Sequence, residues 1–100
     1  MLFRSARYAR YRASGEINSD VADQAGISAQ VRMAYATRPE VTSDELDGLT
    51  VQAPDWWFNL RPSNTEPLLR LNVEAADEVE MAAIRDEVLG LVRGTGSRSE

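Results

Sequence analysis

Two segments that alternate apolar and polar residues, 56–61 and 68–75, lie close together in the second half of the chain. Alternation of this kind is typical of strands that turn one face toward a core. The stretch between them, residues 62–67, is rich in proline, serine, asparagine and threonine, and this composition favours a loop. Residues 49–53 alternate in the same way and end at a proline. The chain is therefore expected to contain three strands joined by short connections.

Two further segments carry apolar residues at the spacing of an amphipathic helix. The stripe of the first is Ile27, Val31, Ala34 and Tyr35. Either Asp20 or Asp23 is a candidate cap for this helix, and Pro39 ends it, because the residue before a proline is pushed out of the helical region. The stripe of the second is Met81, Ile84, Val88 and Leu91. Asp77, followed three residues later by Glu80, resembles a capping box at its start.

A weaker alternation at residues 15–21 adds a strand before the first helix. The order β-α-β-β-β-α predicts an α+β fold, with a four-stranded, mostly antiparallel sheet and two helices on one face, similar to the TATA-box-binding protein. Residues 42–47 are interpreted as a polar connection. We expect one domain over residues 15–93, preceded by a linker or a helix of a preceding domain at 1–14 and followed by a flexible tail at 94–100.

The composition excludes several kinds of chemistry. The chain has no histidine and no cysteine, so it lacks the commonest general base, the commonest metal ligand and any thiolate nucleophile. A formal net charge of −5 argues against nonspecific nucleic-acid binding, which needs a basic surface. No apolar run is long enough for a membrane span or a signal-peptide core. We therefore expect a cytoplasmic protein with neither a nucleic-acid partner nor a membrane partner.

The start of the chain is rich in arginine and free of acidic residues. Its basic side chains are Arg4, Arg7, Arg10 and Arg12. Such a start can mimic a transit peptide, and with Tyr8 and Tyr11 it also suggests a nucleic-acid patch. We interpret it instead as a segment that leads out of a preceding domain.

The loop at 62–67 gathers groups that suit a phosphate dianion. Because side chains alternate along strands, Arg61 at the lip of the loop shares a face with Arg70 on the next strand. Hydroxyl, amide and backbone N–H groups lie between them, and the side chains concerned are Ser63, Asn64 and Thr65. An arginine fork can bind two phosphate oxygens while such groups bind the rest. From residue types alone an alternative stays open, in which Arg61 pairs with Glu66 and the loop is only a polar turn.

Two other clusters have ordinary structural interpretations. The aromatic run at 56–58 suggests a sugar-stacking surface, but consecutive strand residues point to opposite faces. We therefore expect Trp56 and Phe58 in the core and Trp57 partly exposed. The three carboxylates within residues 44–47 lack the pattern of a metal-binding loop and are interpreted as a solvated turn.

Residues 61–70, Arg-Pro-Ser-Asn-Thr-Glu-Pro-Leu-Leu-Arg, resemble the phosphate-binding loop in the last domain of the α-D-phosphohexomutases. Residues 14–19 resemble the segment that opens this domain, and 47–49 with 57–61 are similar to the strands that lead into the loop. The resemblance covers nearly the whole chain. Asn64 favours the phosphomannomutase/phosphoglucomutase branch, because acetylglucosamine and glucosamine mutases usually have glycine there.

The resemblance implies a four-domain enzyme that interconverts hexose 1-phosphate and hexose 6-phosphate through a bisphosphorylated sugar. Its catalytic phosphoserine, Mg²⁺-binding aspartates and sugar-selecting loop would belong to the three preceding domains, since none of their motifs occurs here. This chain would then hold no catalytic residue, no metal site and no cofactor. Mg²⁺ and hexose bisphosphate would be required by the full-length enzyme, and the fragment alone would be inactive.

The resemblance also implies a role for each loop residue. Arg61 would bind the phosphate that is not transferred, and Ser63, Asn64 and Thr65 would complete the cradle. Arg70 and Glu66 are possible supporting residues. The expected partners are a hexose phosphate and the three N-terminal domains of the parent enzyme. The alternative is a free-standing phosphosugar-binding or interaction module without catalysis.

Overall fold

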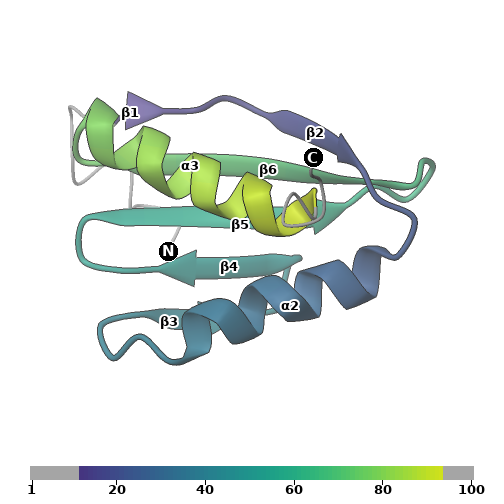
Figure 1. Cartoon of the computed structure of the whole chain (residues 1–100), viewed down its shortest axis with the longest axis horizontal. Helices are drawn as coiled ribbons and strands as arrows, with labels where there is room; N and C mark the ends of the chain where they lie inside the picture. Colours follow the sequence, from purple (N-terminus) through teal and green to yellow (C-terminus); the bar gives the residue numbers. More distant parts are fainter. Residues whose placement is uncertain (1–11, 94–100) are drawn as a thin grey trace.

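The computed structural model describes residues 12–93, which form one sheet and two helices. The strands are β1 (Arg12–Ala13), β2 (Ile17–Asp20), β3 (Thr42–Asp44), β4 (Leu49–Gln52), β5 (Trp56–Pro62) and β6 (Leu68–Ala75). The helices are α2 (Gln24–Ala36) and α3 (Glu78–Val92). The sheet order is β1-β6-β5-β4-β3, with β2 also paired to β6, and each of these pairs is antiparallel. Figure 1 shows both helices on the same face of the sheet.

The α+β class, the antiparallel sheet and the two helices are as predicted, but the sheet has six strands and not four. The prediction of a polar connection was wrong for residues 42–44, which form β3 at the edge of the sheet beside β4. The other additional strand is β1, which pairs with β6 and lies within the stretch 1–14 that we set apart from the domain. Every residue of β1 and β3 is exposed, so neither strand produces an alternating pattern.

The core lies between the sheet and the helices. One face of β4, β5 and β6 is buried, and it contributes Leu49, Val51, Trp56, Phe58, Leu60, Leu69, Leu71, Val73 and Ala75. Trp56 and Phe58 stack with their ring centroids 6.2 Å apart, and the Tyr35 ring meets Phe58 edge-on at 5.2 Å. Trp57 lies on the opposite face, half-buried, and its indole N–H donates to Glu74 Oε1 at 3.1 Å. The placement expected for these three aromatic residues is confirmed.

Both helices begin at an aspartate that caps the backbone. Asp23 accepts from the N–H of Gly26 at 3.0 Å, which decides between the two candidate caps of α2. Asp77 accepts from the N–H of Glu80 at 2.8 Å, as predicted for α3. Neither helix within residues 12–93 is long and apolar enough to cross a bilayer.

The residues that each helix buries differ in part from the predicted apolar stripes. In α2 the buried residues are Val31 and Tyr35, whereas Ala34 is exposed. In α3 it is Val92 that is buried, and Leu91 is only partly so. Both differences depend on how each helix is rotated over the sheet, which a spacing rule does not fix. The end of α3 is Val92, and the predicted tail at 94–100 lies outside the described residues.

One carboxylate joins the two helices. Glu87 on α3 accepts from the Tyr35 hydroxyl at 2.6 Å and from Arg38 Nη2 at 2.7 Å. The Arg38 guanidinium also stacks over the Tyr35 ring, 4.4 Å from its centroid. Burial, followed by the hydrogen bond to Glu87, raises the pKa of the Tyr35 phenol far above its ordinary value.

Candidate functional site

The loop between β5 and β6 lies at the end of the sheet where β2 stops and α2 begins (Figure 1). The two strands stay in register to its base, with Arg61 opposite Arg70 and Pro62 opposite Leu69. A hydrogen bond of 3.0 Å from Ser63 N–H to the carbonyl of Leu68 closes the hairpin. The rigid sheet therefore holds both ends of the predicted phosphate loop.

The structure brings Arg61 and Arg70 together, as predicted from the alternation. They are directly opposed partners on neighbouring strands, and their side chains are 56% and 42% exposed. Within residues 12–93 each has one carboxylate at ion-pair distance: Asp47 Oδ1 lies 3.6 Å from Arg61 Nε, and Glu16 Oε2 lies 3.6 Å from Arg70 Nη1. Like charges directly opposite each other on a sheet are destabilising. An anion bound between the two guanidinium groups would remove that repulsion.

The Nε atom of Arg70 points to the same conclusion. It is buried and has no hydrogen-bond partner within residues 12–93. A buried N–H donor without a partner is costly, and it is more so when the group is charged. Arg70 thus carries an unsatisfied donor beside the loop.

The loop residues form a polar hollow beside the arginines. A cavity of about 230 Å³ is lined by Arg61, Pro62, Ser63, Asn64, Thr65 and Arg70. Ser63 Oγ accepts from the backbone N–H groups of Thr65 and Glu66, each at 3.2 Å, and it lies 3.4 Å from Thr65 Oγ1, so one of these two hydroxyls can donate to the other. Asn64 is exposed and lines the hollow. The hollow therefore offers hydroxyl, amide and guanidinium donors.

The alternative pairing of Arg61 with Glu66 is not present. Among the described residues, the carboxylate that lies within ion-pair distance of Arg61 is that of Asp47. Glu66 takes part in the loop through its backbone, which donates to Ser63 Oγ and accepts from Leu68 N–H at 2.8 Å. Arg61 is thus left with a weak exposed partner and keeps its capacity to bind an anion.

The sequence analysis missed the residues that hold Arg61 in place. Gly48 has a φ of +70°, and a Cβ there would lie 2.6 Å from Arg61 Cγ. Asn59 fixes the same turn, because its amide donates to the carbonyl of Asp47 at 2.9 Å and to Thr50 Oγ1 at 3.0 Å. An Asp-Gly pair before a strand is a turn signal, but it says nothing about which side chain the turn contacts.

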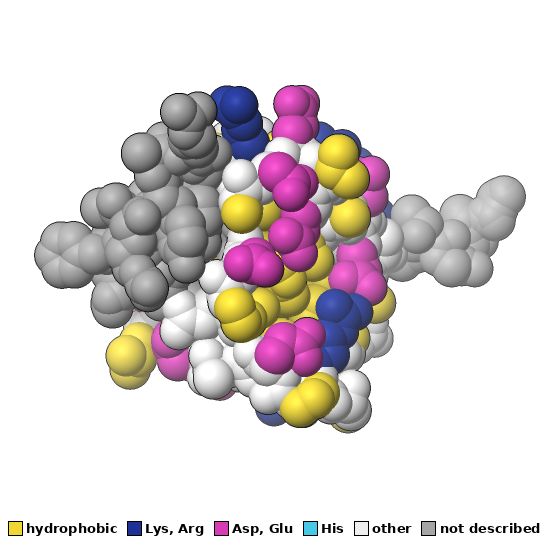
Figure 2. Space-filling model, turned by 90° about the vertical axis from the view of Figure 1, so that its left-hand side faces the viewer, with side chains coloured by type: hydrophobic (Ala, Val, Ile, Leu, Met, Phe, Trp, Pro, Cys, Tyr) yellow, Lys and Arg dark blue, Asp and Glu magenta, His cyan; other side chains and the backbone are white. Residues whose placement is uncertain are grey.

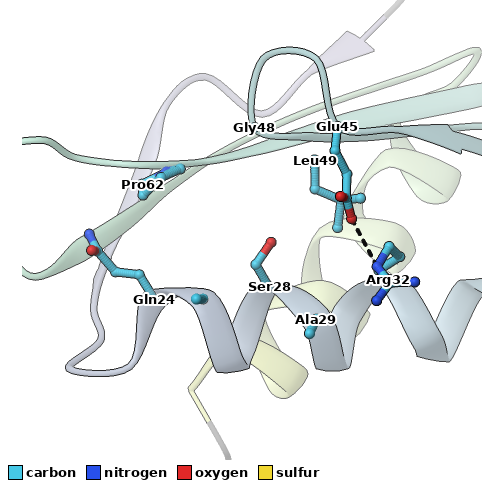
Figure 3. Close-up of a pocket in the computed structure, with 9 residues that line it drawn as sticks. Gln24, Ser28, Ala29, Arg32, Glu45, Gly48, Leu49 and Pro62 are labelled. Atoms are coloured by element: carbon cyan, nitrogen blue, oxygen red, sulfur yellow. Dashed lines mark ion pairs between the residues drawn. The ribbon is translucent and has the colours of Figure 1, made fainter.

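A second, larger cavity lies between α2 and the turn that precedes β4 (Figure 3). Its volume is about 480 Å³, and its lining includes Gln24, Ser28 and Arg32 from one face of α2. Arg32 Nε is 2.8 Å from Glu45 Oε2, so this turn carboxylate is paired. Residues 44–47 are all exposed, as predicted for a solvated turn, and residues 12–93 contain no group of three or more acidic side chains placed to hold a metal ion.

The opposite end of the molecule has a different character. Figure 2 shows acidic side chains gathered among apolar ones on this end. Burial, then the nearby charges of Asp55 and Asp77, raises the pKa of the Glu80 carboxyl. A surface that disfavours one more negative charge does not suit a phosphate group, which leaves the loop end as the candidate site.

A comparison with known families identifies the chain. The family model described as "Phosphoglucomutase/phosphomannomutase, C-terminal domain" matches residues 16–91. The chain therefore belongs to this family.

Curated relatives agree with this phosphoglucomutase/phosphomannomutase assignment. The chain is 44% identical over 85 residues to a phosphomannomutase of Methanocaldococcus jannaschii, a match that covers 85% of this chain and 18% of the relative. It is 43% identical to a phosphomannomutase of Salmonella typhimurium, over 83% of this chain and 18% of the relative. It is also 43% identical to a protein named "Phosphohexose mutases" from Xanthomonas campestris, over 89% of this chain and 20% of the relative.

A solved structure shares the fold. A phosphoglucomutase/phosphomannomutase family protein from Burkholderia thailandensis superposes with a TM-score of 0.64 at 23% sequence identity, covering 89% of this chain and 19% of that one. The chain thus spans about a fifth of the length of the relatives it matches. This mutase-family chain corresponds to one domain of a larger protein.

Proposed function

We propose that this chain is the phosphate-clamping domain of a phosphomannomutase/phosphoglucomutase, an enzyme that interconverts hexose 1-phosphate and hexose 6-phosphate. The observation that carries the proposal is the opposed pair Arg61 and Arg70 above a hollow of hydrogen-bond donors. In this role Arg61 binds two oxygens of the phosphate that is not transferred, and Arg70 contributes the exposed part of its guanidinium group from the same hollow. Ser63, Asn64 and Thr65 complete the cradle.

A clamp of this kind suits a reaction in which the sugar phosphate binds in two opposite orientations. Either phosphate can then occupy the distal position, and the same hollow recognises it. Binding energy from the distal phosphate aligns the reacting end of the sugar, which lowers the barrier through positioning. A domain that closes over the site also excludes water from the reacting phosphoryl group.

The rest of the chemistry belongs to other parts of the proposed parent enzyme. Mg²⁺ and hexose bisphosphate would be required there, and no step through the metal is assigned to this chain. The partners of the chain would be the hexose phosphate and the three preceding domains. The chain alone would bind sugar phosphate without converting it.

A titration of the isotopically labelled 100-residue chain tests the proposal. Glucose 6-phosphate, glucose 1-phosphate and mannose 6-phosphate are added in turn, with glucose as the control that lacks the anion. We expect shifts centred on the amides of residues 61–70 with a dissociation constant of about 1 mM, because a few charge-assisted hydrogen bonds must first offset the cost of association. Shifts that leave the loop unchanged, or equal shifts with glucose, would contradict the clamp.

A coupled assay of the same chain with glucose 1-phosphate, Mg²⁺ and bisphosphate activator should show no turnover. Turnover that a point substitution in this chain abolishes would contradict the assignment of catalysis to other domains.

A further inference from the structure

The side chain of Gln24 reaches the backbone of the anion-binding loop from the first turn of α2. Its Nε2 atom lies 2.7 Å from the carbonyl oxygen of Leu68 and 3.2 Å from those of Ser63 and Glu66. Figure 3 shows the side chain extending from the helix toward the strands. One carboxamide therefore gathers three carbonyl groups from both ends of the loop.

All three carbonyl groups face Gln24 on α2, and two of them belong to residues that do not line the hollow. Gln24 is not among the residues that line the 230 Å³ cavity, and neither are Glu66 and Leu68. A fourth loop carbonyl, that of Pro67, accepts a hydrogen bond of 2.7 Å from the backbone N–H of Val21, the residue that follows β2. The carbonyl groups of four loop residues thus accept hydrogen bonds from Val21 or Gln24, and these residues are Ser63, Glu66, Pro67 and Leu68.

The direction of these carbonyl groups matters because an anion binds N–H and O–H donors and is repelled by carbonyl oxygens. A loop that turned a carbonyl of Ser63 or Glu66 into the hollow would oppose the guanidinium groups. With the carbonyls held by Gln24, the hydroxyl of Ser63 and the amide of Asn64 remain on the cavity side. The carboxamide suits this task, since its NH₂ group supplies two donors.

We propose that Gln24 is a positioning residue of the phosphate clamp, which turns the loop carbonyls away from the bound anion. The proposal rests on the proposed function of the loop. Gln24 does not itself touch the phosphate, so its effect on affinity acts through the loop.

The first test compares Gln24→Met with the wild-type chain by titration with inorganic phosphate at pH 7. Methionine keeps the length of the side chain and the helix propensity but removes both donors. We expect the dissociation constant to rise by about three- to tenfold, as one or two net hydrogen bonds are lost. Hydrogen exchange at the Thr65 and Glu66 amides should quicken. The matched control is Gln30→Met, at an exposed position of the same helix, which should bind phosphate as the wild type does.

The second test uses Gln24→Glu, whose charge at the start of α2 is compatible with folding. Sulfate is the probe, because it stays a dianion between pH 4 and 7. At pH 7 the carboxylate faces three carbonyl oxygens and is repelled by them. The dissociation constant of Gln24→Glu, divided by that of the wild type, should therefore exceed the same ratio for Gln24→Met. At pH 4 the protonated carboxyl regains one donor, and the ratio should fall. A purely structural role would lower the melting temperature without this pH-dependent change in affinity.

Wild-type affinity in Gln24→Met, or a Gln24→Glu ratio that does not change with pH, would overturn the positioning role while leaving the clamp intact. A wild-type loop that responds to neither phosphate nor sulfate would overturn the proposed function, and the positioning role with it. A raised dissociation constant together with recovery at low pH supports the proposal.

Discussion

Gly48 lies directly against the side chain of Arg61. A Cβ at Gly48 would stand 2.6 Å from Arg61 Cγ and 2.7 Å from the carbonyl oxygen of Leu60, closer than real Cβ atoms approach. The neighbouring Asp47 places its carboxylate 3.6 Å from Arg61 Nε. The turn before β4 therefore restricts the stem of the arginine at the lip of the loop and places one weak ion-pair partner beside its head.

Gly48→Ala should lower both the stability and the phosphate affinity of the chain. The φ of +70° costs an alanine about 1–2 kcal/mol, and the clash with Arg61 adds about 1–3 kcal/mol of overpacking. Displacement of Arg61 should raise the dissociation constant for phosphate severalfold. Thermal melting and phosphate titration measure the two effects.

The matched control for this variant is Gly15→Ala. Gly15 has a φ of +75°, but a Cβ there would meet no atom within 4 Å. It should therefore show the conformational cost alone and keep the wild-type phosphate affinity. Equal losses of affinity in the two alanine variants would disprove the contact argument.

Arg61→Lys keeps the charge and loses the planar fork. We expect the dissociation constant for phosphate to rise about tenfold while the melting temperature hardly changes, since the side chain is exposed and its ion pair with Asp47 is weak. In the proposed full-length enzyme, kcat/KM should fall by roughly ten- to several-hundredfold. Arg85→Lys, which alters a surface pair with Asp86 on α3, is the control and should change neither. A destabilised variant with normal phosphate binding would remove Arg61 from the clamp.

Tyr35 should make the chain sensitive to alkali. The pKa of its phenol is raised in the folded state, so its contribution to stability is complete below about pH 10, the unfolded value, and is lost as the pH rises further. Tyr35→Phe loses the bond to Glu87, which costs about 0.5–1.5 kcal/mol at pH 8, but it has no phenol to ionise. Melting curves at pH 8 and pH 11 should therefore show the difference between the two proteins narrowing. A constant difference would contradict this account.

Glu80→Gln should raise the melting temperature at pH 7. The pKa of Glu80 is raised by burial and by Asp55 and Asp77, so the stability linked to its protonated form is present below about pH 4.3 and is lost as the pH rises. Glutamine cannot ionise and avoids that loss, so the two proteins should converge near pH 4. Glu78→Gln, at an exposed position in the same helical turn, should not raise the melting temperature at pH 7. A gain that persists unchanged at pH 4 would point to another cause.

Several features of the fold could be predicted because they depend on residues close together in the chain. The alternation at 56–61 and 68–75 predicted β5 and β6, and with them the shared face of Arg61 and Arg70. The cap at Asp77 follows from its hydrogen bond to a residue three positions away. The edge strands β1 and β3 escaped prediction because they bury no face and leave no periodic trace.

Strands β2, β4, β5 and β6, both helices and the resemblance of the loop to a phosphate-binding loop could be predicted from the sequence, because periodicity, capping and loop composition are local properties. The contacts that hold this loop in place depend on the three-dimensional packing. Gln24 meets the Leu68 carbonyl across 44 positions of sequence, and Asp47 replaces Glu66 as the carboxylate beside Arg61. Such contacts depend on how α2 and the turn before β4 pack at the end of the sheet. No local pattern encodes that packing, since it follows from the burial of the whole core.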